Sequence, residues 1–252
     1  MKKYLNKITC GDSYKLIKEL PDKSVDLIVT DPPYLIENTK AGGGSNLAKS
    51  IQGMNDELAN GILTQGINEE ILNEFMRVMK KPNIYIWCNH KQIPMYLDFF
   101  VNQQKCFFDI IVWVKTNATP LFNNKYLTDK EYCLYFRKGA YCNPQSYEEA
   151  KTVYFQPINI ADKNLYTHTT IKPINIIKTL IKNSSKENDI VLDCFMGSGT
   201  TAVACQDTNR QFIGFEIEQK WVDIANGRLK GLNAEDVKNG QISIFELLGD
   251  KQ

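Results

Sequence analysis

The chain has 252 residues, of which 43% are hydrophobic and 23% are charged, and its formal net charge is +1. These values fit one globular domain with a sizeable core and exclude a disordered chain, while the near-neutral charge alone gives no sign of a nucleic-acid partner. No apolar run approaches the roughly 20 residues that cross a bilayer, and no hydrophobic segment follows the basic start, so we expect a cytoplasmic protein without membrane contact.

Short runs rich in β-branched and aromatic residues alternate with amphipathic stretches along the chain. Strands are predicted at 25–30, 83–88, 108–115, 132–137, 189–195 and 211–216. Helices are predicted at 12–20, 67–81, 173–184, 200–208 and 219–232, where apolar residues recur at spacings of three and four. This alternation is typical of an α/β layered fold.

Two stretches break the alternation. Residues 37–66 are polar and glycine-bearing, and are longer than an ordinary connection, which predicts a mobile loop insertion. Residues 139–167 form a second irregular region, and both stretches are candidates for contact with a substrate. Neither stretch contains arginine. No internal repeat is visible, so residues 1–252 are treated as a single domain.

The strand predicted at 25–30 ends on the stiff corner DPPY, residues 31–34. An exocyclic amino group of a base is a poor nucleophile because its lone pair is drawn into the ring. The Asp31 carboxylate and the Pro32 carbonyl could accept the two amino hydrogens and free that lone pair, while Pro32 and Pro33 fix the backbone beforehand. Tyr34 offers a flat surface on which a base could stack. The plainer alternative is a strand end with a polyproline turn and a surface tyrosine.

A second motif, DIVLDCFMGSGTTAV, begins at residue 189 and predicts a nucleoside pocket. A strand runs to Asp193, a turn carries Gly197 and Gly199, and Thr200 opens a helix. The next strand ends at Glu216, 19 residues after Gly197, where an acid can hold ribose hydroxyls. No lysine follows Gly199 as a P-loop requires, and Ala202 interrupts a full GxGxxG pattern.

Together, these segments resemble the S-adenosylmethionine-dependent DNA amino-methyltransferases of the permuted β class, in which the catalytic motif precedes the cofactor motif. The resemblance covers residues 8–36 and 168–229, and 70–137 more loosely. It implies a class I, Rossmann-like methyltransferase fold, with a seven-stranded mixed sheet and helices on both faces. It also implies S-adenosylmethionine as the cofactor and DNA as the partner. Residues 1–252 would then form a single catalytic domain, with 139–167 as the candidate target-recognition region. Arginine is the commonest bidentate reader of guanine, and its absence from 37–66 and 139–167 favours a short target, weak specificity or a partner subunit that supplies contacts.

The resemblance assigns cofactor contacts residue by residue. Phe195, Gly197, Gly199 and Thr200 would cradle the methionine part, next to Asp193, and Glu216 would hold the ribose. Asp12 would meet the cofactor adenine, and Lys172 with Thr170 would lie near the cofactor carboxylate. Cys194 stands where the family usually has proline, and His168-Thr169 replaces a His-Pro pair, but neither change removes a group that the chemistry needs.

The leading hypothesis is methylation of adenine N6 in DNA, because DPPY accompanies adenine more often than cytosine in this family. Cytosine-N4 methylation, an RNA or protein amino-methyltransferase, and a DNA- and cofactor-binding module without turnover are the alternatives. No structural metal is expected, since seven cysteines without a CxxC pair come with only two histidines. Many relatives form dimers, so a homodimer is a further expectation. We also expect a bacterial or phage protein, which could belong to a restriction-modification system, mark phage DNA or regulate genes.

Overall fold

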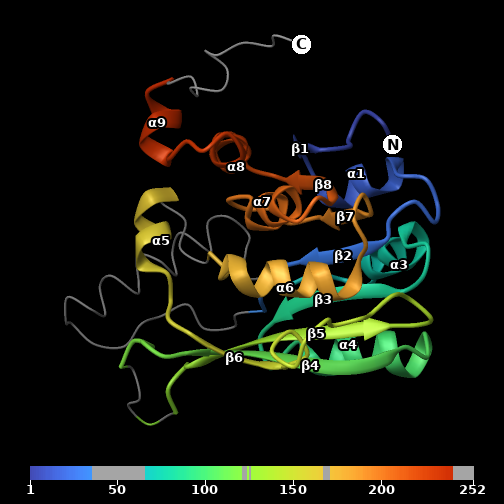
Figure 1. Ribbon diagram of the computed structural model, residues 1–252. Coiled ribbons are helices and arrows are strands. Elements are labelled where there is room, and N and C mark those ends of the chain that lie inside the picture. Colours follow the sequence, from blue (N-terminus) through green and yellow to red (C-terminus); the bar gives the residue numbers. More distant parts are fainter. Residues whose placement is uncertain (36–65, 121–123, 125, 167–170, 241–252) are drawn as a thin grey trace.

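The computed structural model describes residues 1–35, 66–120, 124, 126–166 and 171–240. Its middle layer is an eight-stranded mixed sheet with the order β1-β8-β7-β2-β3-β5-β4-β6 (Figure 1). The strands are β1 (Lys7–Cys10), β2 (Leu27–Thr30), β3 (Asn83–Cys88), β4 (Phe107–Lys115), β5 (Lys130–Arg137), β6 (Val153–Gln156), β7 (Ile190–Asp193) and β8 (Gln211–Glu216).

Five strands, β1, β8, β7, β2 and β3, run parallel to one another. Strand β5 is antiparallel to both β3 and β4, and β6 pairs parallel with β4 at the edge. The carboxyl ends of the five parallel strands therefore meet along one edge of the sheet, where ligands bind in open α/β folds.

The described strands number eight where seven were predicted, although the mixed α/β architecture is confirmed. The two edge strands, β1 and β6, were absent from the predicted runs. Strand β6 lies within 139–167, so this region is less irregular than its sequence suggested, and it also carries α5 (Ile160–Tyr166). The predicted insertion 37–66 lies outside the described residues, apart from Gly66.

Helices cover both faces of the sheet, as predicted. One face carries α1 (Ser13–Leu16), a 3-10 turn (Ile17–Glu19), α3 (Glu69–Val78) and α4 (Ile93–Leu97), which continues into a π-helical turn (Asp98–Gln103). The other face carries α6 (Ile174–Ser184), α7 (Thr200–Asp207) and α8 (Gln219–Leu229), and α9 (Ala234–Lys238) follows α8 (Figure 1). Alternate residues of β2 enter the two cores: Ile28 packs on one side, and Leu27 and Val29 on the other.

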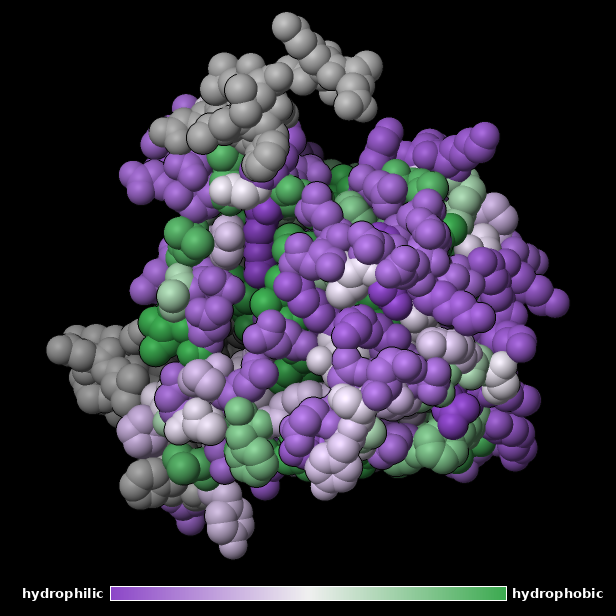
Figure 2. Space-filling view, in the orientation of Figure 1, coloured by the Kyte–Doolittle hydropathy of each residue, from purple (hydrophilic) through white to green (hydrophobic). Residues whose placement is uncertain are grey.

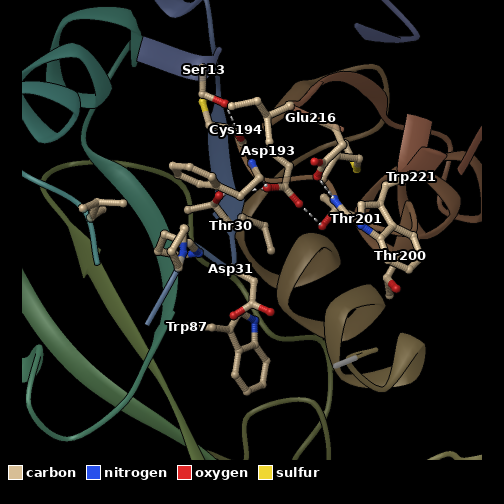
Figure 3. Close-up of a pocket in the computed structure, with 18 of the residues that line it drawn as sticks. Ser13, Thr30, Asp31, Trp87, Asp193, Cys194, Thr200, Thr201, Glu216 and Trp221 are labelled. Carbon is tan, nitrogen blue, oxygen red and sulfur yellow. Dashed lines mark hydrogen bonds between the residues drawn. The ribbon is translucent and has the colours of Figure 1, made fainter. Parts of the chain in front are cut away.

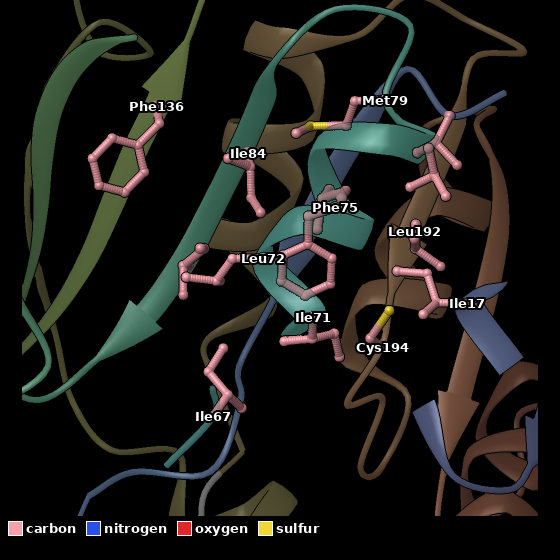
Figure 4. Packing of buried hydrophobic residues seen from close by; sticks show 14 of the residues in the cluster. Ile17, Ile67, Ile71, Leu72, Phe75, Met79, Ile84, Phe136, Leu192 and Cys194 are labelled. Carbon is pink, nitrogen blue, oxygen red and sulfur yellow. The ribbon is translucent and has the colours of Figure 1, made fainter. Parts of the chain in front are cut away.

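Helix α3 shows how local sequence sets these elements. The Asn68 side chain caps the helix by accepting a 3.1 Å hydrogen bond from the Glu70 backbone N–H. Spacings of three and four then place Ile71, Phe75 and Val78 on one buried face. Figure 4 shows Phe75 and Ile71 facing the strand that carries Ile84, at the centre of this core. No helix within the described ranges is long and apolar enough to cross a membrane.

Candidate active site

A cavity of about 570 Å³ opens at the carboxyl ends of the parallel strands. In the orientation of Figure 1, Figure 2 shows the surface hollowed between α5 and α7, with hydrophobic side chains inside the hollow. The cavity is lined by eleven of the predicted site residues, namely Asp12, Asp31, Pro32, Pro33, Tyr34, Lys172, Asp193, Phe195, Gly197, Thr200 and Glu216. The corner after β2 and the glycine loop after β7 therefore share one cavity. Thr170 lies outside the described residues.

The Asp193 carboxylate connects the end of β2 to the glycine loop (Figure 3). Its Oδ1 accepts hydrogen bonds from the Thr30 hydroxyl at 2.8 Å and from the Phe195 backbone N–H at 3.0 Å. Its Oδ2 accepts a 2.7 Å hydrogen bond from the Thr201 hydroxyl. Burial raises the pKa of this carboxyl to about 6 despite these three donors. Both carboxylate oxygens already accept hydrogen bonds from the protein, so the role of Asp193 is to hold the conformation of the glycine loop.

Glu216, at the end of β8, binds the backbone of the glycine loop. Its Oε2 accepts a 2.8 Å hydrogen bond from the Gly197 backbone N–H, and its Oε1 accepts one of 3.0 Å from the Glu218 N–H. Burial raises the pKa of this carboxyl as well. Gly197 has a φ of 52°, in the left-handed region that glycine adopts without strain.

Gly199 has a different place from the one expected. It does not line the cavity; its φ is 85°, and a Cβ built on it would lie 2.8 Å from the Ala225 Cβ of α8. The missing side chain lets α7 begin directly against α8. Its structural contribution is therefore close packing behind the loop.

Asp12 lines the far side of the cavity and caps the four-residue helix α1. Its Oδ1 accepts a 3.0 Å hydrogen bond from the Tyr14 backbone N–H. The hydroxyl of Ser13, the next residue, donates to the Cys194 carbonyl, which joins this helix to the loop (Figure 3). Cys194, the departure from the family pattern, is fully buried and forms part of the cavity wall.

The corner 31–34 is held by the chain that follows β3. The Gln92 side chain donates a 3.1 Å hydrogen bond to the Pro33 carbonyl, and the Asn89 side chain donates one of 2.8 Å to the Leu35 carbonyl. Gln92 is itself buried. Sequence reasoning missed both residues, since nothing in NHKQ, residues 89–92, indicates which backbone it will meet.

Several buried polar atoms at the Asp31 end of the cavity have no hydrogen-bond partner among the described residues. They are Asp31 Oδ1, the Tyr34 hydroxyl and Trp87 Nε1. Figure 3 shows the Asp31 carboxylate next to the Trp87 indole. Because buried polar groups are normally paired, such a group of atoms points to a polar ligand. Trp87 is buried in the core and also lines the cavity.

Lys172 also differs from its expected place. Its ammonium donates a hydrogen bond to Asp31 Oδ2 and lies 3.2 Å from Glu131 Oε2. The structure thus places the ammonium beside Asp31 at the corner 31–34, whereas the resemblance implied the cofactor carboxylate. Glu131, on β5, was not predicted as a site residue; an acid inside the apolar run KEYCLYFR was the available signal. In the described ranges, no group of three or more His, Cys, Asp and Glu side chains is placed to hold a metal ion.

Comparison with known proteins places this geometry among DNA methylases. The sequence profile described as DNA methylase matches residues 25–227. The type II methyltransferase M2.LlaDCHI of Lactococcus lactis subsp. cremoris is 32% identical, covering 87% of each chain. M2.DpnII of Streptococcus pneumoniae is 28% identical, covering 92% of this chain and 94% of its own.

Solved structures agree on the fold. The M1.HpyAVI–SAM complex is 25% identical, with a TM-score of 0.64, and the match covers 88% of this chain and 98% of that one. The PvuII DNA methyltransferase, described as cytosine-N4-specific, is 15% identical, with a TM-score of 0.67, and the match covers 92% of this chain and 89% of that one. At that identity, the second likeness concerns the fold alone.

Proposed function

Because the chain belongs to the DNA methylase family, we propose that it transfers a methyl group from S-adenosylmethionine to the N6 amino group of adenine in DNA. One observation carries the proposal. The Asp31 carboxylate shares a cavity with the glycine loop that Glu216 binds, and one oxygen of this carboxylate has no partner among the described residues. The DPPY form of the corner, which in this family accompanies adenine more often than cytosine, favours adenine.

The residues present fit the cofactor. The cavity volume lies within the range of about 300–1,000 Å³ usual for small-molecule sites. Phe195, Met196 and Trp221 give it apolar walls, and the Glu216 carboxylate, already aligned by two backbone N–H groups, can accept ribose hydroxyls. When bound, S-adenosylmethionine would supply a sulfonium methyl group for attack by an amino nitrogen. The sulfonium would leave as a neutral thioether, and the methylated amino group would release one proton, which the Asp31 carboxylate or water could accept.

At the catalytic corner, the protein's own groups prepare the amino nitrogen. Asp31 Oδ1 accepts one amino hydrogen and the Pro32 carbonyl accepts the other, which draws the nitrogen toward tetrahedral geometry and frees its lone pair. The hydrogen bond from Gln92 to the Pro33 carbonyl keeps this backbone in place before the base arrives. Tyr34 stacks on the base.

The target base has to leave the duplex to reach a cavity at the strand ends, at a cost of a few kcal/mol. Residues 139–167 are the proposed recognition region, since α5 is connected to the start of α7, next to the cofactor loop, through Arg228. Arg228 of α8 donates a 2.9 Å hydrogen bond to the Thr200 hydroxyl, and its guanidinium stacks on the Tyr166 ring at 4.6 Å. A homodimer would enlarge this small DNA-facing surface, and the bacterial relatives favour a bacterial or phage protein that works in the cytoplasm.

A labelled-methyl assay on mixed double-stranded DNA, followed by nucleoside mass spectrometry, tests the proposal. The wild type is expected to produce N6-methyladenine, and Asp31→Ala is expected to produce none while still binding S-adenosylhomocysteine in calorimetry. RNA and bulk protein serve as parallel acceptors.

Each alternative has its own outcome in this assay. If the product is N4-methylcytosine, the target base is cytosine and not adenine. If only RNA or only protein is labelled, the substrate is not DNA. Binding of cofactor and DNA by the wild type without any transfer would leave a binding module.

A further inference from the structure

Four charged side chains of alternating sign lead away from the catalytic corner. Lys172 hydrogen-bonds Asp31 Oδ2 and also contacts Glu131 Oε2 at 3.2 Å. On the other side, Lys115 of β4 lies 2.6 Å from Glu131 Oε1. The Lys172 side chain is only 6% exposed, and no member of the chain exceeds 26%. Removing four charges from water is costly, so such a chain needs a reason beyond stability.

We propose that Lys172, anchored by Glu131, is a positioning residue that holds one oxygen of the Asp31 carboxylate and leaves the other to accept a hydrogen from the target amino group. The inference rests on the proposed function, whose reaction requires that acceptor. The inference gives Lys172 a positioning role beside Asp31, and it gives Glu131 the role of anchoring Lys172.

The geometry divides the two oxygens of Asp31 between two tasks. Oδ2 is bound by Lys172, whereas Oδ1 is buried in the cavity without a partner among the described residues. A carboxylate held through one oxygen is restrained from rotating about its terminal bond, so its free oxygen is already aimed when the base enters. The ammonium also lies over two rings, 5.5 Å from the Tyr34 centroid and 5.4 Å from that of Trp87.

The charges around Asp31 make the ammonium necessary. Burial raises the pKa of the Asp31 carboxyl, Lys172 lowers it, and Glu131 raises it by like-charge repulsion. A protonated Asp31 would present a hydroxyl where the reaction needs an acceptor. The other titratable groups that face it are Tyr34, Cys88 of β3, Tyr96 of α4, Cys133 of β5 and Asp193 of β7.

Two substitutions should move the pKa of the Asp31 carboxyl in opposite directions. Lys172→Met removes the opposite charge, so the pKa of Asp31 should rise. Glu131→Gln removes a like charge, so that pKa should fall. Lys178→Met is the matched control, because Lys178 lies on α6, pairs with Asp207 at 2.6 Å and does not line the cavity; it should leave the titration unchanged.

The measurement is a carbon-13 NMR titration of aspartate side chains in the protein without ligands, with the Asp31 signal assigned by its loss in Asp31→Asn. Single-turnover methyl transfer against pH is the second readout: the acid limb should move up for Lys172→Met and down for Glu131→Gln. Affinity for S-adenosylhomocysteine should change less than about threefold in both, since neither side chain is expected to touch the cofactor. Lys172→Arg, which keeps the charge, should restore most of the wild-type profile.

An unchanged titration of Asp31 in both variants would overturn the inference. So would a tenfold or greater loss of S-adenosylhomocysteine affinity in Lys172→Met with an unmoved pH profile, which would return Lys172 to the cofactor carboxylate. If Lys172→Met does not fold, Glu131→Gln decides alone by the direction of its effect on the Asp31 pKa. The titration needs no turnover, so it tests the role of Lys172 even if the wild type methylates nothing. Absence of methyl transfer by the wild type would count against the proposed function alone.

Discussion

The Thr30 hydroxyl donates a 2.8 Å hydrogen bond to the Asp193 carboxylate, across 163 positions of sequence. Thr30 is the last residue of β2, directly before the corner 31–34, and Asp193 is the last residue of β7, directly before the glycine loop. This buried contact connects the corner that would hold the target amino group to the loop that would hold the methyl donor.

Thr30→Val should loosen that connection while keeping the shape of the side chain. Asp193 Oδ1 would keep only the Phe195 N–H as donor, so the free energy of unfolding should fall by about 1–2 kcal/mol. Urea unfolding followed by circular dichroism measures the change. Thr179→Val on α6, where the hydroxyl donates to the Asn175 carbonyl near the surface, is the control and should change stability by less than about 0.5 kcal/mol. Equal effects of the two substitutions would contradict a special role for the Thr30 contact.

The Asp193 carboxyl should make stability depend on pH in an unusual direction for an acid. Its pKa is raised to about 6 in the folded state, so between about pH 4 and pH 6 the folded chain binds more protons than the unfolded chain at this group. The contribution is therefore fully present below about pH 4 and is lost as the pH rises through 6. Asp193→Asn cannot ionise and should lack it.

Unfolding free energies of wild type and Asp193→Asn, measured from pH 4 to pH 7, test this. The difference should move in favour of the wild type by up to about 3 kcal/mol as the pH falls, because a pKa difference between folded and unfolded chain is a difference in free energy. The Thr179→Val variant, which changes no titratable group, should differ from the wild type by the same amount at every pH. A difference between wild type and Asp193→Asn that stays flat would mean that the carboxyl titrates normally.

Gly199→Ala should destabilise the chain chiefly through packing. The new Cβ would lie 2.8 Å from the Ala225 Cβ and 3.1 Å from its Cα, and the φ of 85° adds strain for any residue with a side chain. A loss of about 2–4 kcal/mol in unfolding free energy is expected. Gly139→Ala is the matched control, because its φ is 64° with nothing within 4 Å of the added Cβ, and should cost about 1 kcal/mol. Equal losses at the two positions would rule out the contact with α8 as the cause.

The parallel centre of the sheet was predictable because each strand is buried on both sides and ends on a distinctive residue. Strands β2, β7 and β8 stop at Thr30, Asp193 and Glu216, and parallel strands bring their carboxyl ends to one edge. The edge strands β1 and β6 escaped prediction because edge strands are buried less and need no long apolar run: KITC has no apolar pair of β-branched residues, and VYFQ has only three apolar residues in a row within a polar region. Phe155 of β6, for instance, is 71% exposed.

The charged residues behind the corner could not be found from sequence for a different reason. Glu131 and Lys115 lie on the antiparallel strands β5 and β4, and only the register of that pair brings them together. Lys172 carried a family expectation, yet its partner depends on where the chain before α6 passes β2. Motifs indicate groups that are close in sequence, whereas this charge chain is assembled across the sheet.

Glu216→Gln should weaken binding of the cofactor product without unfolding the chain. The amide keeps one acceptor but loses the charge that aligns the Gly197 and Glu218 N–H groups, and charged hydrogen bonds contribute roughly 1.5–3 kcal/mol. The dissociation constant of S-adenosylhomocysteine, measured by calorimetry, should rise about 10- to 100-fold. Asp223→Asn on α8, an exposed carboxylate that accepts from Gln219, should leave it unchanged. An unaltered constant for Glu216→Gln would remove Glu216 from the cofactor site.

Trp87→Phe should lower methyl transfer while leaving cofactor affinity intact. The indole Nε1–H is a buried donor without a partner in the described part of the chain, at the Asp31 end of the cavity, and a ring nitrogen of the target base is a suitable acceptor. Losing one such hydrogen bond should slow single-turnover transfer about tenfold. Trp113→Phe is the comparison, since that indole already donates to the Gln156 carbonyl at 2.8 Å and does not line the cavity. It should lower stability and leave the rate per folded molecule unchanged, whereas equal rates for both variants would assign Trp87 to the core alone.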